Sequence, residues 1–132
     1  VHESLRVRPV IPFVVRVLRK PMELGGYLLP SGVTLVPAIH LVHRREDLYP
    51  EPAAFRPERF LDRKPGTYEW LPFGGGMRRC IGASFAVFEM KVVLRRILGQ
   101  ARLAPARAQP ERIRRRAFTL IPEHGTVAVR QA

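Results

Sequence analysis

Phe73-Gly74-Gly75-Gly76-Met77-Arg78-Arg79-Cys80-Ile81-Gly82 is the stretch of sequence that decides the fold. It holds the only cysteine of the chain, and three consecutive glycines precede that cysteine. Glycines allow tight turns and let a bulky, flat partner approach the backbone closely. The segment after Cys80 has helical periodicity, and the N-terminus of a helix stabilises a thiolate through its partial positive charge and free N–H groups. Arg78 and Arg79 add positive potential, so the pattern favours a thiolate at Cys80.

Cys80 has three roles open to it on this pattern: a nucleophile, a metal ligand or an inert buried thiol. A nucleophilic cysteine needs a histidine base, and no motif ties the four histidines of the chain to Cys80. An inert thiol needs only burial, since it behaves as a small apolar side chain. One cysteine excludes an internal disulfide framework and a multi-cysteine zinc site.

Gly82–Leu98 is the one long helix that the sequence predicts. Apolar residues cover most of its circumference, which is typical of a buried helix. Gly99 is a suitable residue to end it. One apolar stripe consists of Ala83, Ala86, Val87, Met90, Leu94, Ile97 and Leu98, and a second apolar face consists of Phe85, Phe88 and Val92.

Short elements and turns are expected in the rest of the chain. Thirteen prolines and ten glycines indicate many turns. The stretch Arg44–Pro72 is irregular, and such a long irregular stretch in a compact domain is usually functional or held by specific contacts. The other predicted elements are a helix over Val1–Val7, a strand over Phe13–Leu18, a hairpin of Met22–Leu24 with Tyr27–Leu29, a strand over Val33–Val36, a short helix over Pro37–His43 and a closing hairpin of Phe118–Ile121 with Thr126–Arg130.

The composition limits the class of protein. A chain of 132 residues with 46% apolar residues suits one modest domain with a core. The net charge of +12 fits an exposed basic surface, a docking face for an acidic partner, or nucleic acid binding. We do not expect nucleic acid binding, because the basic run Arg112–Arg116 has no interleaved aromatics and no recognised module around it. The chain starts with Val1 inside a predicted helix, so we expect a piece cut from a longer protein, and no stretch reaches the length of a membrane span.

Phe73-x-x-Gly76-x-Arg78-x-Cys80-x-Gly82 resembles the haem-binding signature of the cytochromes P-450. Three other segments resemble family features in the family's order. Glu3-Ser4-Leu5-Arg6 is similar to the Glu-x-x-Arg pair on the helix that precedes the family's β region. Tyr49-Pro50-Glu51-Pro52, followed by Phe55-Arg56-Pro57-Glu58-Arg59-Phe60, is similar to the segment that supplies a second arginine to that pair. Arg44-Arg45-Glu46-Asp47 is similar to the stretch just before that segment.

The resemblance implies roles for eight residues. Cys80 would be the axial thiolate ligand of the iron of haem b, the ligation by which this family favours O–O cleavage. Phe73 would pack near the ring and the sulfur, and backbone N–H groups from Gly82 onward would tune the sulfur. Arg78 and Arg16 would pair with the haem propionates. Glu3, Arg6 and Arg59 would form a buried charged cluster that holds the cysteine loop in place.

The resemblance also implies a fold and an activity. Residues 1–132 would be the C-terminal part of a single, mainly α domain, and this α+β part would hold the buried helix and several small β hairpins. The catalytic residues that activate oxygen would lie outside the chain. The parent would be a monooxygenase that takes electrons from an acidic ferredoxin or flavoprotein reductase and inserts one oxygen atom of O2 into a small apolar substrate. The composition suggests a cytoplasmic bacterial protein, although an upstream membrane anchor is not ruled out. The alternatives are a related haem enzyme that uses or rearranges peroxides, and an inactive truncated product.

Overall fold

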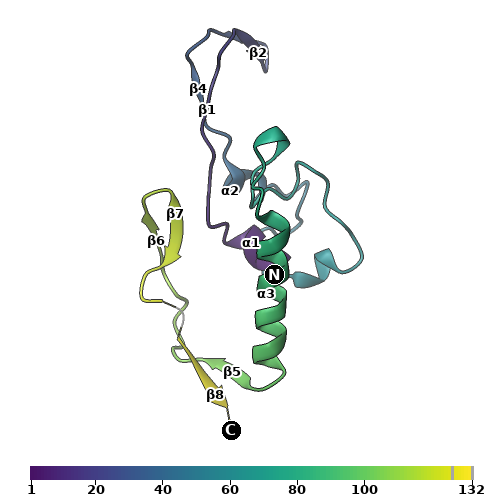
Figure 1. Ribbon diagram of the computed structural model, residues 1–132, viewed down its shortest axis with the longest axis vertical. Coiled ribbons are helices and arrows are strands. Elements are labelled where there is room, and N and C mark those ends of the chain that lie inside the picture. The colour runs from purple at the N-terminus through teal and green to yellow at the C-terminus, as the bar shows by residue number, and fades with distance from the viewer. Residues whose placement is uncertain (126, 132) are drawn as a thin grey trace.

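The computed structural model describes residues 1–125 and 127–131. One long helix and a set of short elements make up the chain, as Figure 1 shows. The helices are α1 (His2–Val7), α2 (Ile39–Val42) and α3 (Ala83–Leu98), with short 3-10 helices η1 (Pro57–Phe60) and η2 (Gly76–Arg78). The strands are β1 (Arg16–Val17), β2 (Met22–Leu24), β3 (Tyr27–Leu29), β4 (Thr34–Leu35), β5 (Arg102–Pro105), β6 (Ile113–Arg116), β7 (Thr119–Pro122) and β8 (Ala128–Gln131).

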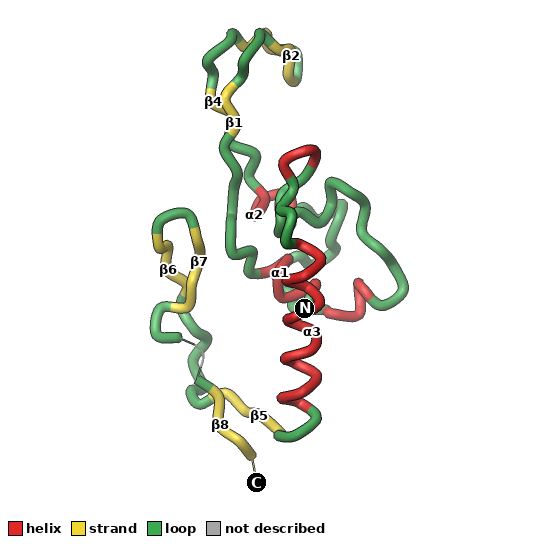
Figure 2. The backbone as a smooth tube through the Cα atoms, in the orientation of Figure 1, coloured by secondary structure: helices red, strands yellow, loops and turns green. Residues whose placement is uncertain are grey.

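The strands pair as four separate two-stranded antiparallel sheets. β1 pairs with β4, and the tight hairpin of β2 and β3 lies at the end of that ladder. β6 and β7 form a second hairpin, while β5 pairs with β8 across the loop that contains this hairpin. Figure 2 shows the β1–β4 ladder at one end of the molecule and the β5–β8 ladder at the other, with the β6–β7 hairpin level with α1 and α2.

The core is small and lies around α1 and the irregular loops. α1 packs on η1, and its buried residues are Glu3, Leu5 and Arg6. Aromatic rings extend this contact, because His2 lies edge-on to Trp70 at 4.8 Å between ring centroids and Phe60 lies 6.4 Å from Trp70. The remaining fully or largely buried residues are Pro9, Ile39, His43, Tyr49, Pro72 and Ala83. The core therefore joins α1 to the segment that leads into the cysteine loop.

Most of the predicted elements are confirmed. The predicted N-terminal helix is α1, the predicted short helix contains α2, and the hairpin of β2 and β3 has the predicted bounds. α3 begins after Gly82 and ends at Gly99, whose N–H donates to the carbonyl of Arg95 at 3.0 Å. The predicted strand over Phe13–Leu18 is shorter, since only Arg16 and Val17 pair.

The predicted closing hairpin is wrong. β7 pairs with β6 rather than with the segment after it, and β8 pairs with β5. The reversal between β6 and β7 has Ala117 at φ +52° in a tight turn, which the sequence pattern did not suggest. Of the predicted strand 126–130, Thr126 lies outside the described residues.

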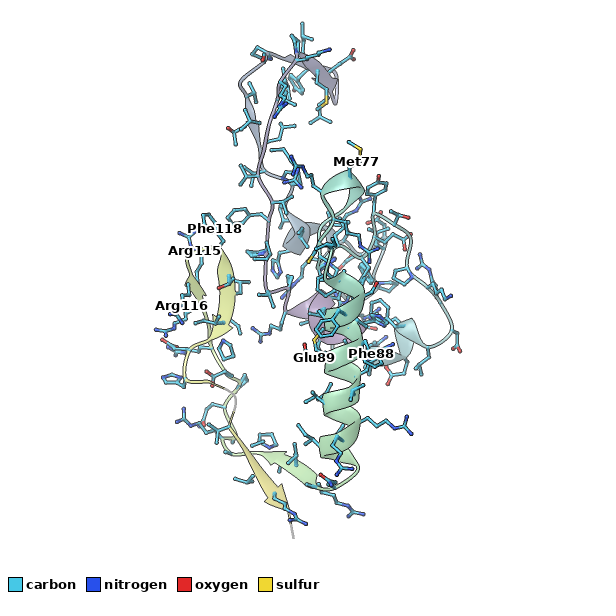
Figure 3. The ribbon with its side chains drawn as sticks, viewed as in Figure 1. Met77, Phe88, Glu89, Arg115, Arg116 and Phe118 are labelled. Atoms are coloured by element: carbon cyan, nitrogen blue, oxygen red, sulfur yellow. The ribbon has the colours of Figure 1, made fainter. Side chains whose placement is uncertain are left out.

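The prediction that the helix after the cysteine is buried is also wrong for this chain. Only Ala83 of α3 is buried, while Phe85 is 67% exposed and Phe88 is 65% exposed. Figure 3 shows α3 with its side chains largely free of neighbours. The apolar pattern indicates that the helix needs cover, but beyond Ala83 the described residues cover only Ala86, Val87 and Met90 in part. No helix in the described ranges is long and apolar enough to cross a membrane.

Candidate functional site

The cysteine loop is a short hairpin that ends at the start of α3. The N–H of Cys80 donates to the carbonyl of Phe73 at 2.9 Å and closes the loop, and the N–H of Gly74 donates to the carbonyl of Leu71 at 2.8 Å. Gly74 and Gly76 have φ angles of +71° and +64°, which residues other than glycine rarely adopt. The sequence FGGG therefore makes a turn that returns the chain to Cys80 with a fixed geometry.

The Cys80 thiol lies in the open at the N-terminus of α3. Cys80 is exposed, and Gly82 is the residue that caps the helix. A Cβ atom at position 82 would lie 3.8 Å from the Cys80 Sγ, so glycine keeps the space next to the sulfur clear. Met77, at the tip of the loop, points away from the molecule in Figure 3. The geometry presents one thiol, with nearby free N–H groups of a helix start, to whatever binds there.

Of three other predicted cofactor-binding side chains, Phe73 and Arg78 belong to the loop and Arg16 belongs to β1. Arg78 is exposed at the end of η2, and within residues 1–125 and 127–131 no hydrogen bond or ion pair engages its guanidinium. Phe73 is half-buried at the base of the loop, where its ring lies edge-on to Trp70 at 6.0 Å. Arg16 is exposed on β1, and its Nη1 donates to the carbonyl of Val15 at 2.8 Å. The structure thus joins Phe73 to Cys80 directly and leaves Arg16 apart from the loop.

Glu3, Arg6 and Arg59 come together in one buried cluster. Arg6 makes a two-point contact with the Glu3 carboxylate, with Nε to Oε2 and Nη2 to Oε1 both at 2.7 Å. Neither of these two side chains is exposed at all. Arg59 approaches more distantly, with its Nε 3.3 Å from Glu3 Oε1. The backbone N–H of Arg56 donates to the same oxygen at 2.8 Å, so Glu3 also fixes the start of η1.

Besides binding Glu3, Arg6 also holds the irregular stretch in place. Its Nη1 donates to the carbonyls of His43 at 2.8 Å and Pro52 at 2.9 Å, and its Nη2 donates to the carbonyl of Ala54 at 3.1 Å. The guanidinium also lies over the ring of Tyr49, 5.0 Å from its centroid. Charge-assisted hydrogen bonds are stronger than neutral ones, so this single side chain holds a long segment without regular structure.

Residues 69–71, which lead into the cysteine loop, are held by three side chains. The Tyr49 hydroxyl donates to the carbonyl of Glu69 at 3.0 Å. The Trp70 Nε1–H donates to the carbonyl of His2 at 3.1 Å. The backbone N–H of Leu71 donates to the His43 Nε2 at 2.8 Å. We call these contacts the three-point clamp, and they connect the base of the loop to α1, to the end of α2 and to the irregular stretch.

Burial and hydrogen bonds together set the protonation states of Glu3, His43 and Tyr49. Burial raises the pKa of the Glu3 carboxyl, but hydrogen bonds from Arg6 and the Arg56 N–H outweigh it, so the pKa lies below its ordinary value. Burial lowers the pKa of His43 from 6.5 to about 4, although its hydrogen bond to the Arg6 backbone opposes the change. Burial raises the pKa of Tyr49 to about 12. Near neutral pH the cluster therefore holds a charged Glu3, a neutral His43 and a protonated Tyr49.

Sequence reasoning missed His43, Tyr49 and Trp70. All three side chains bond to backbone atoms. Because every residue type offers such atoms, the identity of the partner residue does not reveal the bond. The only available signal was their place in or beside the irregular stretch, which was expected to be held by specific contacts.

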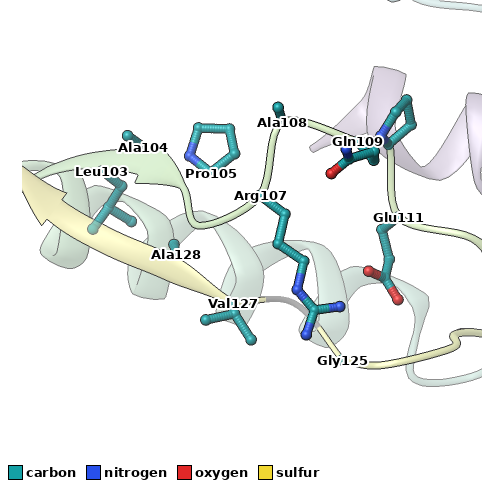
Figure 4. A pocket seen from close by; sticks show the side chains of 11 residues that line it. Leu103, Ala104, Pro105, Arg107, Ala108, Gln109, Glu111, Gly125, Val127 and Ala128 are labelled. Atoms are coloured by element: carbon teal, nitrogen blue, oxygen red, sulfur yellow. The ribbon is translucent and has the colours of Figure 1, made fainter.

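A cavity lies at the C-terminal end of the chain. It has a volume of about 450 Å³ and lies between the β5–β8 ladder and the loop 107–111, as Figure 4 shows. Arg107 and Glu111 line it on one side and Leu103 and Val127 on the other. None of the predicted site residues lines this cavity. In the part of the chain that the structure describes, no group of three or more His, Cys, Asp or Glu side chains is placed to hold a metal ion. A metal at Cys80 would have to bring its other ligands with it.

Comparison with known proteins gives one consistent result. The family model for cytochrome P-450 matches residues 1–129. A Mycobacterium tuberculosis protein named "Putative cytochrome P-450 137" is 43% identical over 126 residues, which cover 96% of this chain and 26% of that protein. A Mycobacterium bovis protein named "Putative cytochrome P-450 135B1" is 47% identical over 93% of this chain and 26% of its own length. The chain thus spans about a quarter of these curated relatives.

A solved structure agrees with these sequences. A 6-coordinated cytochrome P-450 from Thermus thermophilus superimposes with a TM-score of 0.85 and 38% identity. The match covers 99% of this chain and 34% of that one. The arrangement of the short sheets, the loops and α3 is therefore shared with a complete protein of this family.

We predict that Glu3→Gln destabilises the protein by about 3–5 kcal/mol, because it leaves the buried Arg6 charge without its partner. Urea-induced unfolding of the protein measures the change. The control is Asp47→Asn, which breaks a pair with Arg45 whose side chains are 57% and 60% exposed. An exposed pair contributes less than about 1 kcal/mol. Equal, small losses in both variants would contradict the structural role of Glu3.

We also predict that stability falls as the pH is lowered from about 6.5 to about 4 through His43. In that window the unfolded chain binds a proton at His43 that the folded chain does not, so acid favours unfolding, by about 2–3 kcal/mol in total. The measurement is the free energy of unfolding as a function of pH. His43→Gln cannot titrate and is expected to show a shallower dependence across the same window. An unchanged slope in the variant argues against a neutral, buried His43.

Proposed function

Because the chain belongs to the cytochrome P-450 family, we propose that it is the C-terminal part of a single haem domain in a haem-thiolate monooxygenase. The cofactor of this family is haem b. In our proposal the whole protein inserts one oxygen atom of O2 into a small apolar organic substrate. The observation that carries the proposal is the exposed Cys80 thiol, held by a hydrogen-bonded glycine loop at the start of α3.

The residues around Cys80 fit a haem. Cys80 would offer one sulfur ligand to the iron, and the porphyrin would bring its own nitrogen ligands. The lack of a side chain at Gly82 and the turns at Gly74 and Gly76 let a flat ring approach the loop backbone. When bound, haem with a thiolate ligand supplies the electron-rich iron that favours O–O cleavage. The protein's part would be to hold the Cys80 sulfur in place and to limit the access of water to it.

Phe73 and Gly82 would support the sulfur. The Phe73 ring lies at the base of the loop beside Trp70, and its carbonyl accepts the bond from Cys80. A ring in this position limits the access of water to the sulfur. The first N–H groups of a helix have no partner within it. The N–H of Ala83 donates to the Cys80 carbonyl at 3.3 Å, and those of Gly82 and Ser84 would hydrogen-bond the thiolate.

Arg78 and Arg16 would hold the two propionates. A buried carboxylate needs a cationic partner, and a guanidinium provides two parallel donors. Arg78 is exposed beside the loop and has no carboxylate partner in the described ranges, so it is available. Arg16 is exposed and, among the residues that the structure describes, bonds only the neighbouring carbonyl of Val15, so it could turn to a ligand.

Two apolar segments would face the substrate. The N–H of Leu120 donates to the carbonyl of Val10 at 2.7 Å, which brings β7 beside the segment Val10–Val15. A cavity of about 560 Å³ lies at this junction, with Val10, Ile113 and Leu120 among its lining residues. Phe118, at the turn between β6 and β7, is 71% exposed. Arg8, Arg44 and Glu111 also line the cavity, so it is the apolar part of this surface that supports an apolar substrate.

The electron donor would dock on the basic side of α3. Lys91, Arg95 and Arg96 are exposed on this helix, which starts next to Cys80. A positive patch attracts a negatively charged partner and speeds encounter. We therefore propose an acidic ferredoxin or flavoprotein reductase as the partner.

We predict that Cys80→Ala abolishes the thiolate signature in the reduced carbonyl spectrum of the full-length protein, because the variant has no sulfur to ligate the iron. A second variant adds Ser84→Cys to Cys80→Ala and places a thiol one turn further along α3. It is expected not to restore the signature, since the loop and not the helix positions the sulfur. If the thiolate signature persists in Cys80→Ala, Cys80 is not the ligand of the iron.

We predict that Arg78→Leu and Arg16→Leu each speed the loss of haem to a scavenger globin about tenfold or more. A lost charge-assisted hydrogen bond is worth about 1.5–3 kcal/mol, and each 1.4 kcal/mol is about a factor of ten. The matched control is Arg79→Leu, next to Arg78 in the same loop and without an assigned role. Haem loss that is equally fast in all three variants argues against propionate binding by Arg78 and Arg16.

A further inference from the structure

His43 is completely buried at the C-terminal end of α2, with 0% of its surface exposed. A buried histidine has to find partners for both ring nitrogens or lose hydrogen bonds to water. Both of its ring nitrogens have partners here, and these partners belong to distant parts of the chain. One is Arg6, 37 residues earlier, and the other is Leu71, 28 residues later.

The two bonds allow only one form of the ring. The Leu71 backbone N–H donates to Nε2 at 2.8 Å, and an N–H group can only donate, so Nε2 carries no proton. The carbonyl of Arg6 lies 3.2 Å from Nδ1 and can only accept, so Nδ1 carries the proton. The ring is therefore neutral, with its hydrogen on Nδ1. The Arg6 guanidinium in turn donates to the His43 carbonyl at 2.8 Å, so the two residues hold each other in both directions.

A short path leads from His43 to Cys80. Leu71, whose N–H bonds the ring, uses its carbonyl to accept from the N–H of Gly74 at 2.8 Å. Phe73 then accepts from the N–H of Cys80 at 2.9 Å. His43 is thus the point at which the buried ion pair meets the base of the cysteine loop.

We propose that His43 is a positioning residue for Cys80, and that its imidazole transmits the rigidity of the Glu3–Arg6 pair to the cysteine loop through the N–H of Leu71. The inference rests on the proposed role of Cys80 as the iron ligand. His43 touches neither the cofactor nor the sulfur in this account; it acts through the backbone of residues 71–74.

The groups that face the ring agree with a neutral imidazole. The Arg6 charge and His40, on the same helix, both oppose protonation. Tyr49 faces the ring edge-on at 6.3 Å between centroids, and its own hydroxyl stays protonated. The bond to Leu71 is therefore present throughout the neutral pH range. An apolar ring of the same size would fill the space but could not accept from Leu71.

The test compares His43→Phe with His40→Phe in the full-length holoprotein. His40 is half-buried on the same helix, and its Nδ1 has no hydrogen-bond partner in the described ranges, so it is a matched control. We expect His43→Phe to speed hydrogen exchange of the amides of Leu71, Gly74 and Cys80 at least tenfold, with α3 unchanged. We also expect a several-fold faster loss of the thiolate signature in the reduced carbonyl spectrum. His40→Phe is expected to leave both as they are, and His43→Gln, which keeps a donor and an acceptor, to recover part of the loss.

The proposal is overturned if exchange rises evenly over the whole protein, or if neither readout changes. Should His43→Phe not fold, nitrogen-15 spectra of the wild-type carbonyl complex decide. The proposal requires the Nδ1–H form of His43 and a bond from the Leu71 amide to Nε2, and a ring protonated on Nε2 overturns it. Exchange at Leu71 does not depend on haem ligation, so this result and the Cys80→Ala result can fail separately.

Discussion

The buried pair of Glu3 and Arg6 is the interaction on which the rest of the structure depends. Burying two charges is costly, and the cost is offset only when the remaining hydrogen-bonding capacity is satisfied. A guanidinium has five N–H donors, and all of them are used: two on Glu3 and one each on the carbonyls of His43, Pro52 and Ala54. Three carbonyls of the stretch 43–54 are thus directed at one side chain, while turn hydrogen bonds such as that from Tyr49 to Arg45 shape the chain between them.

This arrangement keeps the buried charges apart from the exposed groups of the cysteine loop. The side chains of Glu3 and Arg6 are fully enclosed, whereas Arg78 and Cys80 are exposed on the loop. The three-point clamp joins the two groups through residues 69–71. The loop is thus supported by side chains that do not belong to its exposed surface.

The sequence indicated local structure well and long-range structure poorly. The bounds of α3 follow from Gly82 and Gly99, and the hairpin of β2 and β3 follows from Gly25 and Gly26, because glycine and proline act on their immediate neighbours. The pairing of β6 with β7 and of β5 with β8 was missed, since the alternation of apolar residues does not specify which strand is the partner. The exposure of α3 was missed for a related reason: an apolar face shows that a helix needs cover, but not whether the same segment of chain supplies it.

The same limit explains which site residues were found. Cys80, Arg78, Glu3 and Arg6 stand in motifs where residue type and spacing are both informative. The members of the clamp bond to main-chain atoms, so position 69 has only to offer a carbonyl and position 71 only an N–H. Every residue meets the first demand, and any residue except proline meets the second. The clamp therefore depends on the side chains of Tyr49, Trp70 and His43. Only the folded chain shows that these three residues hold one short segment.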